Sequence, residues 1–126
     1  MAGDYKYQDL TDKIIECFYQ VYNTLGYGFL EQVYEKALQA ELIEQGLKAE
    51  RQVPIQVQYK GKIVGDYFAD VIVNQLVILE LKACEALNES HSLQLINYLK
   101  ASETEVGLLL NFGKKPQIVR KISTNK

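Results

Sequence analysis

The sequence predicts one α/β domain in which helices cover a mixed β-sheet. Three observations lead to this fold class: two helical patterns come first, three strand patterns follow, and a further helix separates these from two more strands. The order is therefore α-α-β-β-β-α-β-β. A chain of 126 residues, 48% hydrophobic and 24% charged, suits a single domain, which should span residues 1–126 with its core at about 8–122.

The two N-terminal helices are predicted by apolar residues that recur at helical intervals. The first should run from about residue 8 to residue 25, with Asp9 or Thr11 available as its N-cap. A glycine-containing turn interrupts the pattern, and the second helix should run from about residue 30 to residue 45. Gly46 would end this helix, because glycine readily adopts the left-handed conformation common after helix C-termini.

Strand patterns follow, and the first three should form an antiparallel meander. They are the alternating segment 53–59, a segment that begins at residue 62 and continues through 66–73, and the segment 76–82. A helix capped by Asn88 or Ser90 should then run to about Ser102. The apolar segment 106–112 predicts a buried strand, parallel to an earlier strand across this helix, and residues 117–122 predict a final edge strand.

The central hairpin, residues 66–82, carries charges among apolar neighbours. Asp70 lies between Phe68 and Ile72 in the strand alternation, and Glu80 and Lys82 end a face that begins with apolar residues. An unpaired carboxylate removed from water costs several kcal/mol, and Lys82 cannot neutralise two of them. A bound divalent cation is the simplest missing partner, although an exposed hairpin with a Glu80–Lys82 surface ion pair is the alternative.

The same hairpin predicts its own pairing register. Asp70 and Glu80 can share a site only if they lie opposite one another or an even number of positions apart. A two-residue turn would pair Asp70 with Leu79 and send Glu80 to the far side. We therefore expect a three-residue loop at about Asn74 to Leu76, or a β-bulge nearby.

Composition limits the classes of protein to consider. No stretch approaches the roughly 18 apolar residues of a membrane span, and the N-terminus lacks the pattern of a signal peptide, so we expect a cytoplasmic protein without membrane contact. Cys17 and Cys84 have no CxxC-type spacing, which indicates neither a zinc site nor a disulfide framework. Six of the 14 lysines and arginines lie in residues 100–126 and could meet phosphates, or form only a solvated tail.

Several motifs together resemble the PD-(D/E)XK nuclease superfamily. They are Glu31 on the second helix, Asp70 on one strand, Glu80-x-Lys82 on the next strand, and Gln94-x-x-x-Tyr98 on the following helix. Gly28 to Tyr34 also spells GxxExxY, the signature of a bacterial family with this fold, and the Gln94–Tyr98 spacing resembles the QxxxY motif of RecB-like exonucleases. Ala69 stands where the superfamily name has proline.

The resemblance implies a sandwich fold and metal-assisted phosphodiester hydrolysis. Lys82 would orient the attacking water and neutralise a phosphate oxygen, and Gln94 and Tyr98 would position these groups by hydrogen bonds. Mg²⁺ or Mn²⁺ would be held by oxygen ligands, namely the carboxylates of Asp70 and Glu80, the carbonyl of Leu81, and Glu31 directly or through water.

Three functions follow from this reasoning. The leading hypothesis is a Mg²⁺-dependent nuclease that acts on DNA, with a homodimer as a plausible assembly. The second is a catalytically silent nuclease fold used for binding or assembly, because a chain of 126 residues that is acidic overall has little room for a substrate-recognition domain. The third is binding or hydrolysis of RNA or of a nucleotide.

Overall fold

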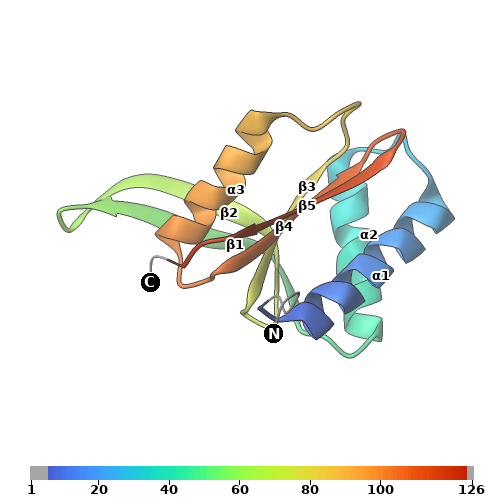
Figure 1. The fold of residues 1–126 in the computed structure, drawn as a ribbon, viewed down its shortest axis with the longest axis horizontal. Coiled ribbons are helices and arrows are strands. Elements are labelled where there is room, and N and C mark those ends of the chain that lie inside the picture. The colour runs from blue at the N-terminus through green and yellow to red at the C-terminus, as the bar shows by residue number, and fades with distance from the viewer. Residues whose placement is uncertain (1–5, 125–126) are drawn as a thin grey trace.

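The computed structural model describes residues 6–124 and has the expected order of elements. Within these residues, three helices pack against a single five-stranded sheet, and Figure 1 shows that the sheet is twisted. The elements are α1 (Gln8–Leu25), α2 (Glu31–Glu44), β1 (Ala49–Tyr59), β2 (Lys62–Val73), β3 (Val77–Lys82), α3 (Glu89–Ala101), β4 (Val106–Phe112) and β5 (Pro116–Ile122). The predicted α/β fold class is therefore confirmed.

The sheet is mixed, and its strand order is β1-β2-β3-β4-β5. Neighbouring strands are antiparallel except for β3 and β4, which are parallel with Val77 opposite Val106 and Lys82 opposite Asn111. The parallel pair is the one joined by α3, because parallel neighbours need a crossover connection. The expected meander and crossover are both present.

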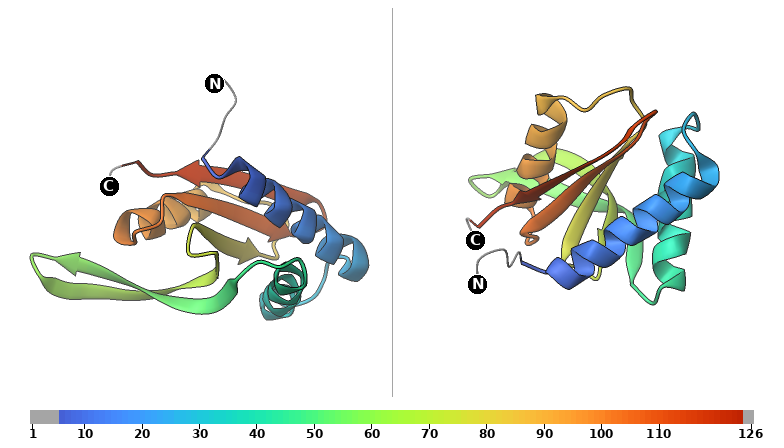
Figure 2. Two further views of the ribbon diagram at one scale, coloured as in Figure 1. Left: turned by 90° about the horizontal axis from the view of Figure 1, so that it is seen from below. Right: turned by 45° about the vertical axis from the view of Figure 1, so that its right-hand side comes forward.

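Helices cover both faces of the sheet. Helices α1 and α2 pack on one face, and α3 packs on the other (Figures 1 and 2). On the first face, the rings of Tyr34 and Phe112 stack with centroids 4.4 Å apart, and Phe18 meets Phe112 edge-on at 4.7 Å. On the second face, Leu95 and Leu99 of α3 are fully buried in a separate apolar cluster. No described helix is long and apolar enough to cross a lipid bilayer.

Tyr34, the last residue of the GxxExxY sequence, holds the turn between α1 and α2. Its hydroxyl donates to the carbonyl of Gly26 at 2.6 Å and accepts from the backbone N–H of Phe29 at 3.1 Å. The side chain is completely buried against Phe112. Tyr34 therefore fixes the start of α2, and with it the position of every side chain on that helix.

Three expected boundaries need correction or refinement. Neither Asp9 nor Thr11 caps α1, because the N-cap is Tyr7 in a left-handed conformation without a side-chain cap. Strand β1 begins at Ala49 rather than near residue 53, since its first residues pair with the end of β2. Of the two candidates for the start of α3, Asn88 is the N-cap, and its side chain accepts from two backbone N–H groups of the first turn.

The central hairpin has the predicted three-residue loop. Val73 pairs with Val77, so residues 74–76 form the connection. Asn74 and Gln75 both have positive φ, at 52° and 58°, and Asn74 exchanges hydrogen bonds with the backbone of Lys48. Asparagine tolerates this conformation better than most residues, which explains why the turn forms here.

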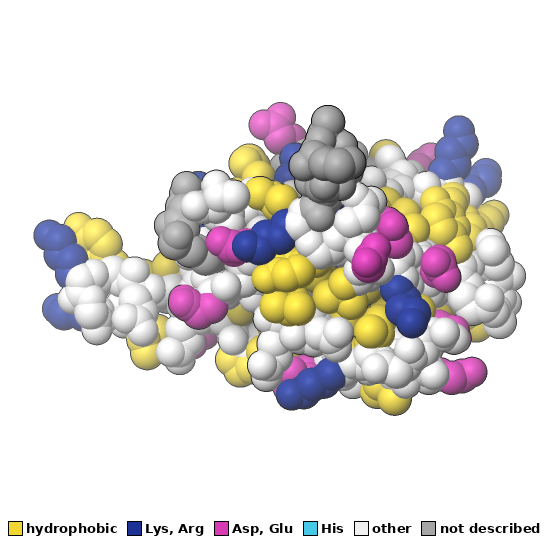
Figure 3. Space-filling model, turned by 60° about the horizontal axis from the view of Figure 1, so that its bottom comes forward, with side chains coloured by type: hydrophobic (Ala, Val, Ile, Leu, Met, Phe, Trp, Pro, Cys, Tyr) yellow, Lys and Arg dark blue, Asp and Glu magenta, His cyan; other side chains and the backbone are white. Residues whose placement is uncertain are grey.

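Strand β2 is much longer than its pairing with β3. Its residues 71–73 pair with β3, whereas its pairing with β1 continues to Lys62. From Val71 toward Lys62, β2 and its partner β1 leave the sheet as a projecting hairpin, which we call the β1–β2 arm (Figure 2, left). Figure 3 shows basic and hydrophobic side chains at the outer end of this arm, and mixed charges on the rest of that face.

Candidate active site

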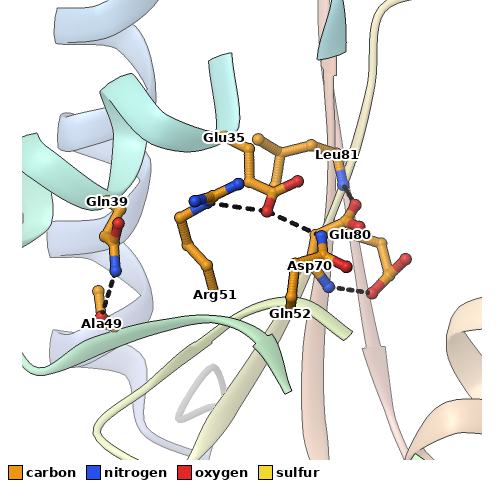
Figure 4. Close-up of polar contacts among 8 residues, drawn as sticks. All are labelled: Glu35, Gln39, Ala49, Arg51, Gln52, Asp70, Glu80 and Leu81. Atoms are coloured by element: carbon orange, nitrogen blue, oxygen red, sulfur yellow. Dashed lines mark hydrogen bonds and ion pairs between the residues drawn. The ribbon is translucent and has the colours of Figure 1, made fainter. Parts of the chain in front are cut away.

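The candidate site lies at the fork where β2 leaves β3. Pairing between these strands ends at Val71 opposite Leu79, and the same register would place Asp70 opposite Glu80. There the side chains replace the backbone ladder: Glu80 Oε2 accepts the N–H of Asp70 at 3.0 Å, and Asp70 Oδ2 accepts the N–H of Leu81 at 2.8 Å (Figure 4). The two carboxylates therefore bridge the strands where these separate.

This position makes the two carboxylates costly to ionise. Burial, followed by the negative charge of Asp70, raises the pKa of Glu80 to about 8. Burial also raises the pKa of Asp70 to about 6, although the hydrogen bond from Leu81 opposes the change. Lys82 lowers both pKa values at a distance, but within residues 6–124 no lysine or arginine forms an ion pair with either carboxylate.

Each carboxylate keeps one oxygen that is open to solvent. Asp70 Oδ1 and Glu80 Oε1 accept no hydrogen bond from the described residues. In that same part of the chain, Ser123 Oγ is the one side-chain oxygen or nitrogen that is both sealed from solvent and unpaired. The free oxygens of Asp70 and Glu80 therefore face space that water or an ion can enter.

Glu35 is a third acidic residue at this site, and it is not among the residues that the motifs predict. Its side chain projects from α2 toward the Asp70–Glu80 pair (Figure 4), and its charge raises the pKa of both carboxyl groups. Glu35 Oε1 accepts from Arg51 Nε at 3.0 Å and from Gln52 Nε2 at 2.8 Å. The signal available in the sequence was its place seven residues before Leu42, on the apolar side of the helix.

Glu31 has a weaker electrostatic effect on the Asp70–Glu80 pair than Glu35 has. It is the exposed first residue of α2, and it raises the pKa of Asp70 less than Glu35 does. Within the described residues, no group of three or more His, Cys, Asp or Glu side chains is placed to hold a metal ion. The expected role of Glu31 as a ligand, directly or through water, therefore stays a prediction.

Helix α3 brings the remaining predicted pair to the opposite side of the fork. Gln94 Nε2 donates to the hydroxyl of Tyr98 at 3.1 Å. Tyr98 is 7% exposed, and its pKa is raised first by burial and then by the charge of Glu80. Tyr98 therefore lies within electrostatic reach of the carboxylates.

The donor set fits a hard divalent cation. Asp70 and Glu80 offer oxygen atoms, form no ion pair within the described chain, and each keep an oxygen open to solvent. Mg²⁺ and Mn²⁺ prefer oxygen ligands and commonly bind through one or two carboxylates together with waters and substrate phosphates. Two converging carboxylates are therefore sufficient protein ligands for such an ion.

Comparison with known proteins identifies the family of this chain. A family model described as PD-(D/E)XK nuclease superfamily matches residues 8–122. The crystal structure of SSO0001 is similar with a TM-score of 0.60 and 19% identity over 95% of this chain, which supports the fold. This chain spans 61% of the length of SSO0001, and no curated protein matches it. Since the family model extends from the first residue of α1 to the last residue of β5, the chain belongs to the PD-(D/E)XK nuclease superfamily.

Proposed function

We propose that this protein is a divalent-cation-dependent phosphodiester hydrolase that cleaves DNA. The observation that carries the proposal is the Asp70–Glu80 pair, in which a half-buried carboxylate and a buried one meet at the fork without an ion pair from the described residues. Such a pair is costly to a fold unless a cation completes it. Membership of a nuclease superfamily agrees with this reading of the site.

The proposed metal ligands are oxygen atoms from three segments. When bound, Mg²⁺ or Mn²⁺ would lower the pKa of a coordinated water and stabilise the negative charge that develops on the phosphate. The chain would hold the ion through the following groups: Asp70, Glu80, the carbonyl of Leu81, and Glu31 directly or through water. Glu35 would keep Arg51 and Gln52 beside these ligands, since it already binds both side chains.

Other residues of the chain would handle the substrate and the water. Lys82, at the end of β3, would neutralise a phosphate oxygen and orient the attacking water. The raised pKa of Tyr98 keeps its phenol protonated at neutral pH. Because the Tyr98 oxygen accepts its hydrogen bond from Gln94, its own O–H is free to donate to Glu80 or to a phosphate oxygen.

We also place the chain in the GxxExxY branch of the superfamily, with a RecB-like QxxxY pair. The support is local: Tyr34 holds the turn that starts α2, and Gln94 is hydrogen-bonded to Tyr98 one helical turn away. These contacts give each motif a physical role, one in positioning α2 and the other in positioning a donor near the carboxylates.

Metal binding and cleavage can be tested separately. Titration calorimetry should detect binding of Mn²⁺ to the wild type and its loss in Asp70→Asn, whereas Asp66→Asn, an exposed residue of the same strand, should bind normally. Labelled DNA should be cleaved by the wild type and the Asp66→Asn control but not by Lys82→Ala. Metal binding without cleavage of DNA or RNA would instead support the silent binding module, and absence of both would refute the proposal.

A further inference from the structure

A groove lies between α3 and the β1–β2 arm. Its volume is about 890 Å³, near the upper end of the range for small-molecule sites. The arm contributes Gln56, Gln58 and Tyr67 to the lining, and α3 contributes Gln94, Asn97 and Tyr98. Tyr98 is also within electrostatic reach of Glu80 and Asp70, and Gln94 is hydrogen-bonded to Tyr98, so the groove borders the candidate site.

The lining suits a polyanion that carries hydrogen-bonding bases. Among residues 6–124, no aspartate or glutamate lines the groove, although the chain contains 16 acidic residues, and Lys100 is the one charged lining residue in that range. The remaining polar groups are mainly side-chain amides, which can donate and accept hydrogen bonds without repelling phosphate. The groove is therefore neutral to basic in a chain whose net charge is −2.

Tyr67 gives the groove an aromatic surface. Its side chain is 47% exposed, although its ring centroid lies 5.6 Å from that of Tyr98. The ring also lies over Gly65, where an added Cβ would stand 2.9 Å from Tyr67 Cε2. Glycine at position 65 and Tyr98 thus support a ring that remains partly open to the groove.

We propose that this groove binds single-stranded nucleic acid, with an unpaired base stacked on Tyr67 and the following phosphodiester at the Asp70–Glu80 fork. The proposal rests on the proposed hydrolase function and names the form of its substrate. A base inside a duplex is already stacked on its neighbours, so an aromatic ring in a groove can stack only with a base that is unpaired. Amides and Lys100 then contact base edges and phosphates without a fixed sequence preference.

Binding can be measured without cleavage. Fluorescence anisotropy in EDTA should show that labelled oligothymidylate binds the wild type more tightly than the same strand within a duplex. Tyr67→Ala should weaken the single-strand affinity roughly 5- to 150-fold, the effect of losing one stacked base, whereas Tyr67→Phe should retain it. Tyr59→Ala, which removes an exposed ring of the same arm outside the groove, should bind like the wild type. An oligouridylate of equal length distinguishes RNA from DNA.

A second variant tests the position of the ring rather than its presence. Gly65→Ala should displace the Tyr67 ring and weaken single-strand binding, with the melting temperature recorded to confirm folding. Unchanged affinity in folded Tyr67→Ala, or tighter binding of duplex than of single strand, would overturn the groove proposal. Single-strand binding without any cleavage would support the groove proposal and refute the proposed hydrolase function. Duplex cleavage that Tyr67→Ala leaves unchanged would support the hydrolase function and refute the groove proposal.

Discussion

Replacing Glu80 with glutamine should stabilise the cation-free protein at alkaline pH. The folded-state pKa of Glu80 is about 8 and its ordinary value is 4.5, so the folded protein binds this proton more tightly than the unfolded chain does. Stability from this group is therefore fully present below pH 4.5 and is lost as pH rises toward 8. Glu80→Gln removes the ionisation and keeps an oxygen that can accept the N–H of Asp70.

The size of this effect follows from the two pKa values. A difference between 4.5 and about 8 corresponds to at most about 5 kcal/mol, since one pKa unit equals about 1.4 kcal/mol. The hydrogen bond from the Asp70 N–H already reduces the cost of ionising Glu80, and part of the increase in its pKa comes from the negative charge of Asp70 rather than from burial. We therefore expect a gain of about 2–4 kcal/mol for Glu80→Gln at pH 9, and little gain at pH 5.

Urea unfolding followed by circular dichroism, in EDTA and from pH 5 to pH 9, measures this gain. Glu44→Gln, an exposed residue at the end of α2, serves as the matched control and should change little at any pH. Mg²⁺ should stabilise the wild type at pH 9 and have little effect on Glu80→Gln. Parallel pH profiles for the wild type and Glu80→Gln would refute the assignment of Glu80 as a buried, uncompensated carboxylate.

Three further substitutions test the surroundings of the site. Gly113→Ala would place a Cβ 2.0 Å from the carbonyl oxygen of Cys84, so urea unfolding should show a loss of about 3 kcal/mol or more, and a change below 1 kcal/mol would contradict this packing. Tyr34→Phe removes the hydroxyl that bonds Gly26 and should cost about 1–3 kcal/mol in the same assay while leaving metal affinity intact. Lys82→Ala should reduce DNA cleavage by about 10²- to 10⁴-fold with metal binding retained, and loss of metal binding would instead give Lys82 a structural role.

Local sequence patterns were sufficient to predict the elements and the register of the central hairpin. The apolar intervals of the helices and the continuous apolar segment of β4 are recorded in consecutive residues, so the bounds of α1 and β4 match the structure. The need for Asp70 and Glu80 to share a site required an odd loop, and the Val73–Val77 pair provides it. The cap of α1 was mispredicted, because a left-handed Tyr7 without a side-chain cap leaves no sequence signal.

The composition of the site was only partly readable from the sequence. Asp70, Glu80 and Lys82 stand out because charges interrupt apolar strands, and the first two bridge the strands at the fork. Glu31 and Glu35 both lie near the apolar side of α2, and periodicity alone does not separate them. The position of the helix start determines which of the two is buried, since Glu31 is the exposed first residue of α2 and Glu35 is buried one turn later.

Patterns of neighbouring residues are enough to predict the order of the elements, the relative directions of the strands and the residues whose charges need a partner. Tertiary structure alone decided where β2 leaves β3, that Glu35 meets Arg51 and Gln52, and that the arm and α3 enclose a groove. These features join segments far apart in the chain. Their positions depend on how a twisted sheet packs between helices, and no local pattern records that packing.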